Sequence, residues 1–107
     1  MGHAGGFEML VMLAVLRLGS DAYGVTIRDE LEAETSRTLT LGTVYKTVGR
    51  LEAKGHLRSH TSAPTAERGG RRKKMYELSP SGLAAVRRSL DDLQRLTRGL
   101  DLASERS

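Results

Sequence analysis

A long apolar stripe near the end of the chain constrains the fold more than any other feature. Its residues recur at spacings of 3, 4, 3, 3 and 4, the pattern of one helix face: Leu83, Val86, Leu90, Leu93, Leu96 and Leu100. We call this set the leucine seam. A helix from Leu83 to Leu100 would be about 25 Å long, at 1.5 Å per residue. An intradomain core alone is too short to cover that length, so we predict that a second copy of the chain does, related by a two-fold axis.

Three shorter helices are predicted before the seam. Residues 7–18 are apolar around most of a helix, which indicates burial on two sides, the second by another subunit. Asp21 is a suitable N-cap for a second helix that runs to about Glu34. Thr40 can cap a third helix, which Gly55 would end. In that helix the spacing of apolar residues predicts three that face the core: Val44, Val48 and Leu51.

Two short strands, at residues 56–61 and 73–78, flank a loop that contains Pro64 and a glycine pair, which indicates a hairpin. Alternation places Lys74, Tyr76 and Leu78 on one face of the second strand, and predicts a buried Leu78 and a structural Tyr76. A short bridge of strand is expected at Thr38–Leu39. Ser79 and Pro80 then form a strong start signal for the last helix. The order helix, helix, helix, hairpin, helix predicts a mainly α fold: a winged helix-turn-helix with an added C-terminal helix.

Positive charge is concentrated in one segment of this fold. Residues 37–74 hold 10 Lys or Arg and 2 Asp or Glu, a net charge of +8, whereas the whole chain has only +4. The remaining residues therefore sum to −4. Such focusing suits a surface that faces a polyanion better than it suits general solubility. A helix that can enter a groove, followed by a basic hairpin, is how a small domain can grip duplex DNA.

The third helix supplies one part of the predicted DNA-binding surface. Its outward positions are predicted to be Gly42, Thr43, Lys46, Thr47 and Arg50, with Thr40 at the cap. Lysine and arginine can bind guanine or phosphate, and threonine can bind phosphate or touch a thymine methyl group. The alternative is a solvated polar face.

Tyr45 and Gly49 of the same helix have less obvious roles. The ring of Tyr45 could pack on the second helix while its hydroxyl reaches phosphate. Gly49 is costly inside a helix, by about 1 kcal/mol relative to alanine. Close packing against the second helix would explain Gly49, and neutral drift is the alternative.

The hairpin supplies the other part. Its loop and second strand contain five cations around a glycine pair that allows a tight turn: Arg68, Gly69, Gly70, Arg71, Arg72, Lys73 and Lys74. These cations are predicted to contact phosphates or to place one arginine in the minor groove. A solvated charge run is the alternative.

Several other functions are disfavoured. The chain has no Cys, which excludes disulfides and thiolate metal sites and is consistent with a reducing cytoplasm. His56 and His60, on one strand, would lie about 13 Å apart. We therefore predict no metal or cofactor, and the absence of catalytic motifs predicts that the chain is not an enzyme. The longest apolar run has eight residues, Met9 to Leu16, too few to cross a bilayer, and no export signal is evident.

The sequence resembles the PadR family of bacterial transcriptional regulators, in its short form with a single C-terminal helix. The resemblance covers roughly residues 7–100 and rests on pieces that are specific in this order: Leu13-Ala14-Val15-Leu16, Ala22-Tyr23-Gly24-Val25-Thr26-Ile27, Leu41-Gly42-Thr43-Val44-Tyr45, Arg50-Leu51-Glu52-Ala53-Lys54-Gly55, the hairpin from Pro64 to Lys74, and Tyr76-Glu77-Leu78-Ser79-Pro80-Ser81-Gly82.

The resemblance implies a homodimer joined through the first and last helices, which binds an inverted-repeat operator and usually represses. The interface would then include Phe7, Leu10 and Leu13 of the first helix together with the leucine seam. Many members carry a phosphate-contacting tyrosine where this chain has Val25, so that residue is either missing or replaced by Tyr23. The family usually has a larger residue at Gly49. Some relatives bind aromatic drugs through a tryptophan, which this chain lacks.

We therefore predict a single domain over residues 1–107, with a DNA-binding part at 7–78 and a dimerisation helix at 79–103. The predicted function is a cytoplasmic, dimeric, sequence-specific DNA-binding repressor. The alternatives are a winged-helix module that binds an acidic protein, and an RNA-binding winged domain. The residues do not identify an effector molecule, an operator or a regulated gene.

Overall fold

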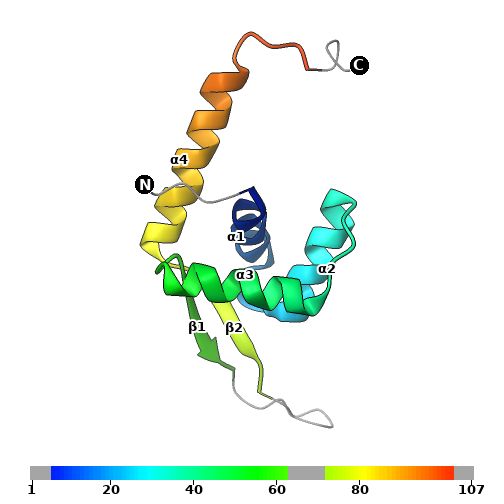
Figure 1. Cartoon of the computed structure of the whole chain (residues 1–107). Helices are drawn as coiled ribbons and strands as arrows, with labels where there is room; N and C mark the ends of the chain where they lie inside the picture. Colours follow the sequence, from blue (N-terminus) through cyan, green and yellow to red (C-terminus); the bar gives the residue numbers. More distant parts are fainter. Residues whose placement is uncertain (1–5, 63–71, 103–107) are drawn as a thin grey trace.

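The computed structural model describes residues 6–62 and 72–102 of the chain. The elements follow the predicted order: α1 (Gly6–Leu18), a 3₁₀ turn (Gly19–Asp21), α2 (Gly24–Thr35), α3 (Leu41–Ala53), β1 (Leu57–Thr61), β2 (Lys74–Leu78) and α4 (Pro80–Thr97). Helix α3 runs across α1 and α2, the hairpin projects beside it, and α4 leads away from them (Figure 1). This is the predicted winged helix-turn-helix with an added C-terminal helix.

The core lies between the first three helices. It is aliphatic, and α1 contributes most to it because nearly every side of that helix carries apolar residues. Ile27 and Leu31 reach it from α2. The three residues of α3 that were predicted to face the core are fully buried: Val44, Val48 and Leu51.

The start of α2 differs from the prediction, because its N-cap is Tyr23 and not Asp21. The backbone at residues 22 and 23 is extended and pairs with β2 instead of entering the helix. The N–H of Tyr76 donates to the carbonyl of Ala22 at 2.9 Å, and Tyr23 forms a bridge with Met75. The expected bridge at Thr38–Leu39 is wrong, since those residues lie in no strand. The third strand segment therefore comes from the residues before α2.

The other helix boundaries follow their capping residues. The side chain of Thr40 accepts the N–H of Thr43 at 3.1 Å, and Gly55 follows α3 with a positive φ of 80°. Ser79 accepts the N–H of Gly82 at 3.0 Å. The predicted end of the last helix is wrong, because α4 stops at Thr97 and Gly99 has a φ of 83°. Leu100 is therefore not on the helix.

The hairpin is antiparallel, with Leu57 opposite Leu78 and Thr61 opposite Lys74. Both strands begin one residue later than predicted. Leu78 is only half-buried, contrary to expectation, whereas Met75 is buried because its strand pairs with Tyr23.

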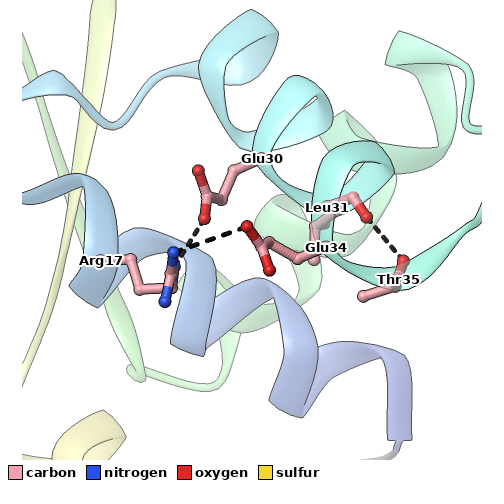
Figure 2. Close-up of polar contacts among 5 residues, drawn as sticks. All are labelled: Arg17, Glu30, Leu31, Glu34 and Thr35. Carbon is pink, nitrogen blue, oxygen red and sulfur yellow. Dashed lines mark hydrogen bonds and ion pairs between the residues drawn. The ribbon is translucent and has the colours of Figure 1, made fainter.

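Ion pairs join α1 to its neighbours. Figure 2 shows the guanidinium of Arg17 beside two carboxylates of α2: its Nε donates to Glu30 at 2.5 Å, and its Nη2 lies 3.7 Å from Glu34. At the other end of α1, the buried Glu8 accepts a hydrogen bond from Nζ of Lys54 at 2.8 Å. These contacts hold α1 against both α2 and the end of α3. Over the described ranges, no helix has the length and apolar character needed to cross a membrane.

Candidate nucleic-acid interface

The outward face of α3 carries four of its five predicted residues. Gly42, Thr43, Lys46 and Arg50 are exposed, as is Thr40 at the cap. The prediction was wrong for Thr47, which is 3% exposed and donates its hydroxyl to the carbonyl of Thr43 at 3.0 Å. Thr47 lies three residues after Val44 and next to Val48, so it falls on the core side of the helix. It helps to pack α3 and presents almost no surface to a partner.

Tyr45 lies between α3 and the start of α2. A Cβ atom added at Gly24 would lie 2.5 Å from Cε1 of Tyr45 and 2.6 Å from its hydroxyl, so the ring packs directly on that glycine. The packing of Tyr45 on the second helix is therefore confirmed, and the side chain remains 49% exposed. The close packing expected at Gly49 is wrong: no atom lies within 4 Å of a Cβ added there.

The hairpin approaches the same region through Lys73. Its Nζ lies 4.3 Å from the centre of the Tyr23 ring, a cation–π distance. The N–H of Ser62 donates to the carbonyl of Lys73 at 2.7 Å, and the N–H of Lys73 donates to the hydroxyl of Ser62 at 2.9 Å. These two hydrogen bonds extend the strand pairing beyond β1. Arg72 and Lys73 are exposed. The predicted residues Arg68, Gly69, Gly70 and Arg71 lie outside the described residues.

Lys74 has a contact that sequence reasoning missed. Its Nζ lies 3.3 Å from Oε1 of Glu52 on α3, and Oε2 of Glu52 accepts a hydrogen bond from the hydroxyl of Ser59 at 2.5 Å. This hydrogen bond, with help from Lys74, holds the pKa of Glu52 below its usual range, although partial burial opposes the shift. The sequence did contain a signal for this contact: Glu52 is one of only two acids in the otherwise basic segment 37–74.

The neighbouring Tyr76 is structural, as predicted. It is 5% exposed, and burial raises the pKa of its hydroxyl. His56 bonds Ser81 through Nδ1 at 3.0 Å, which gives it a structural contact. Within residues 6–62 and 72–102, no group of acidic and histidine side chains could hold a metal ion.

These placements define a continuous surface, which we call the basic face. Its members are exposed or half-buried and come from α3, the start of α2 and the hairpin: Tyr23, Thr40, Gly42, Thr43, Tyr45, Lys46, Arg50, Arg72 and Lys73. Tyr45 joins α3 to the start of α2, and Tyr23 joins the start of α2 to Lys73. Cations, hydroxyls and a helix N-terminus on one surface can bind an anionic backbone and the edges of bases.

The predicted interface residues differ in how far they are exposed. Leucines in and after α4 are between 45% and 76% exposed: Leu90, Leu93, Leu96 and Leu100. Leu83 and three residues of α1 are half-buried: Phe7, Leu10 and Leu13. Val86 is 2% exposed and belongs to the core, so it offers almost no area to a partner. Leu16 of α1, which is 46% exposed, is a further apolar residue on the surface.

A profile of the PadR-like family of transcriptional regulators matches residues 12–88, from α1 into α4. The chain belongs to this family. Its members regulate transcription, and proteins of that kind are generally not enzymes. A comparison with curated proteins gave no match.

Solved structures of PadR-like proteins share the fold. A PadR family regulator from Clostridium difficile R20291 is 24% identical with a TM-score of 0.68, over 87% of this chain and 93% of that one. One from Eggerthella lenta is 27% identical with a TM-score of 0.66, over 92% and 84%. Bacillus subtilis PadR in complex with operator DNA is 20% identical with a TM-score of 0.66, over 80% of this chain and 47% of that one. The chain thus spans about half the length of the Bacillus subtilis protein.

Proposed function

We propose that this PadR-like chain is a homodimeric, sequence-specific DNA-binding repressor that recognises an inverted-repeat operator. The observation that carries the proposal is the continuity of the basic face. Tyr45, packed on Gly24, and Tyr23, beneath Lys73, connect the exposed side of α3 to the hairpin. The similarity in fold to a PadR that was solved with operator DNA supports the same use of this surface.

Each part of the basic face has a distinct task in this proposal. The first turns of α3 enter the major groove, where Thr43 and Lys46 meet base edges. Arg50 lies further along the helix and binds guanine or phosphate. Arg72 and Lys73 bind the phosphates beside that groove. Tyr23 and Tyr45 offer their hydroxyls to the backbone.

The exposed leucines of α4 support the homodimer. Leu90, Leu93 and Leu96 follow one face of a helix that leads away from the core, and about half or more of each side chain is exposed. Covering this face with a second copy removes apolar area from water. A two-fold dimer then presents two α3 helices to half-sites about one turn, or 10–10.5 bp, apart. Occupation of such a site would exclude the transcription machinery.

The first experiment selects duplexes from randomised DNA and measures the affinity for the selected operator by fluorescence anisotropy at several salt concentrations. We expect log K to fall linearly with log salt, with a slope of about −0.9 for each phosphate neutralised. Failure to bind any duplex would favour a protein-interaction module. Preferential binding of structured or single-stranded RNA would favour an RNA-binding domain.

Substitutions separate the two parts of the basic face. Arg72→Ala with Lys73→Ala should weaken binding to all duplexes and reduce the salt slope by about 1 for each phosphate contact that is lost. Thr43→Ala or Lys46→Ala should instead relax the preference for particular bases, by about 1–3 kcal/mol at one position. Arg88→Ala on α4 is the control, since it removes a charge outside the basic face. If the control and the basic-face variants behave alike, the assignment of the surface is wrong.

A further inference from the structure

A single carboxylate ties both strands of the hairpin to α3. Glu52 lies near the end of that helix, and each of its oxygens has a partner. Oε2 accepts the hydroxyl of Ser59 on β1 at 2.5 Å, and Oε1 lies 3.3 Å from Nζ of Lys74 on β2. Ser59 and Lys74 share one face of the hairpin in its register. The hairpin is therefore fixed to the helix at two points, the middle of β1 and the loop end of β2.

The outer edge of β2 and the residue before it are tied to the start of α2. Lys73 lies 4.3 Å from the centre of the Tyr23 ring, and the N–H of Tyr76 donates to Ala22 at 2.9 Å. Successive residues of a strand point to opposite faces, so Lys73 and Lys74 reach different neighbours. The hairpin is thereby held between α3 and the segment that precedes α2.

Electrostatics alone does not favour an acid at position 52. Residues 37–74 have a net charge of +8 and only two acids, and Glu52 both adds a negative charge and engages one of the cations. On a surface that binds a polyanion, such a residue lowers affinity for any duplex. A fixed orientation of the hairpin would offset that loss only at a site that matches it.

We propose that Glu52 is a positioning residue for specificity: it holds the hairpin in the orientation that a matching operator requires, through Ser59 and Lys74. This proposal rests on the DNA-binding function proposed above. Glu52 raises the ratio of operator affinity to non-specific affinity without touching DNA. Its carboxylate orders the hairpin before binding, so less conformational freedom is lost at the operator.

The test compares Glu52→Ala and Ser59→Ala with the control Glu77→Ala, an exposed acid on β2. Affinity is measured for the selected operator and for a scrambled duplex of the same composition. For Glu52→Ala we expect tighter binding of the scrambled duplex and about a tenfold fall in the ratio of operator to scrambled affinity. Ser59→Ala changes no charge, so it should lower the ratio without tightening the scrambled complex. Glu77→Ala should tighten both complexes equally and leave the ratio unchanged.

Amide hydrogen exchange of the DNA-free protein gives an independent readout. Glu52→Ala and Ser59→Ala should speed exchange in β1 and β2 while exchange in α1 stays unchanged, which a general loss of stability would not produce. The proposal is overturned if Ser59→Ala keeps the ratio and Glu52→Ala behaves like Glu77→Ala, or if hairpin exchange is unaffected. If no variant or wild-type protein binds a duplex, the DNA-binding function fails, and the exchange data still decide whether Glu52 orders the hairpin.

Discussion

At the scale of single residues, Gly24 has the close packing that was expected at Gly49. Gly49 is unfavourable inside α3, and close packing was the expected reason for it, yet it faces open space. Gly24, at the start of α2, is the glycine that permits close contact, because the ring of Tyr45 occupies the position that a side chain would take. Tyr45 can therefore take its position on the basic face only because residue 24 has no side chain.

This contrast predicts opposite effects of the same substitution. Gly24→Ala should destabilise the protein by about 1–3 kcal/mol, because the added methyl forces Tyr45 to move. Gly49→Ala should stabilise it by up to about 1 kcal/mol, since alanine favours the helix and meets no neighbour. Urea unfolding of both variants measures the difference. Equal effects would show that Tyr45 does not pack on Gly24.

Glu52 predicts a dependence of stability on pH. Its pKa is lowered in the folded protein, chiefly by the hydrogen bond from Ser59, so folding favours the ionised form. The stabilisation is complete above the ordinary glutamate pKa of about 4.3, and it is lost as pH falls through the lowered value. Urea unfolding between pH 3 and 7 should show wild type more stable than Glu52→Gln above about pH 5, with the difference shrinking below it. A difference that is constant across this range would contradict the ion pair and hydrogen bond.

At the scale of elements, the junction between α3, β1 and α4 fixes the direction in which α4 leaves the core. A Cβ atom added at Gly82 would lie 2.1 Å from the carbonyl oxygen of His56, so only glycine lets the helix approach that backbone. The same carbonyl accepts the N–H of Ser79 at 3.0 Å, and the hydroxyl of Ser79 donates to Gly55. The first turn of α4 is therefore bound to the loop that ends α3.

Gly82→Ala should destabilise the protein by about 2–3 kcal/mol, because the clash is with backbone and not with a flexible side chain. Gly42→Ala is the matched control: it also lies near a helix start, and the nearest atom to an added Cβ is 3.8 Å away. Thermal unfolding of the two variants checks the prediction. A Gly82→Ala protein as stable as its control would mean that α4 can shift at its base without loss.

At the scale of the whole molecule, the two proposed partners, DNA and a second copy of the chain, would use different parts of the surface. The basic face gathers cations from α3 and the hairpin, whereas α4 exposes leucines at 45% or more. The two surfaces lie on different elements, and α4 leads away from α3 and the hairpin (Figure 1). The proposed dimerisation and the proposed DNA binding would therefore not compete for the same residues.

Leu90→Glu should dissociate the proposed dimer, because the interface would bury an unpaired charge. The protomer itself should remain folded, since Leu90 is 45% exposed within it. Analytical ultracentrifugation gives the oligomeric state, and circular dichroism gives the helix content. Ala84→Glu adds the same charge to the same helix at an exposed position away from the face of Leu90, and it should remain dimeric. A Leu90→Glu protein that sediments as a dimer would refute this interface.

Much of the fold could be predicted from the sequence. Apolar periodicity located the helices, and the caps Thr40, Gly55 and Ser79 marked their boundaries, because both signals act over one or two turns of the same segment. The concentration of cations in residues 37–74 also pointed to the surface that α3 and the hairpin share. These features are local, so the order of residues is enough to determine them.

The tertiary structure decided where distant segments meet. The pairing of Tyr23 with Met75, the ring of Tyr45 on Gly24, and the bonds from Glu52 to Ser59 and Lys74 each join residues that are separated along the chain. Val86 joined the core for the same reason, since burial depends on the neighbours that packing supplies. Local patterns specify elements and their faces, but the contacts between elements follow from how their side chains fill the shared space.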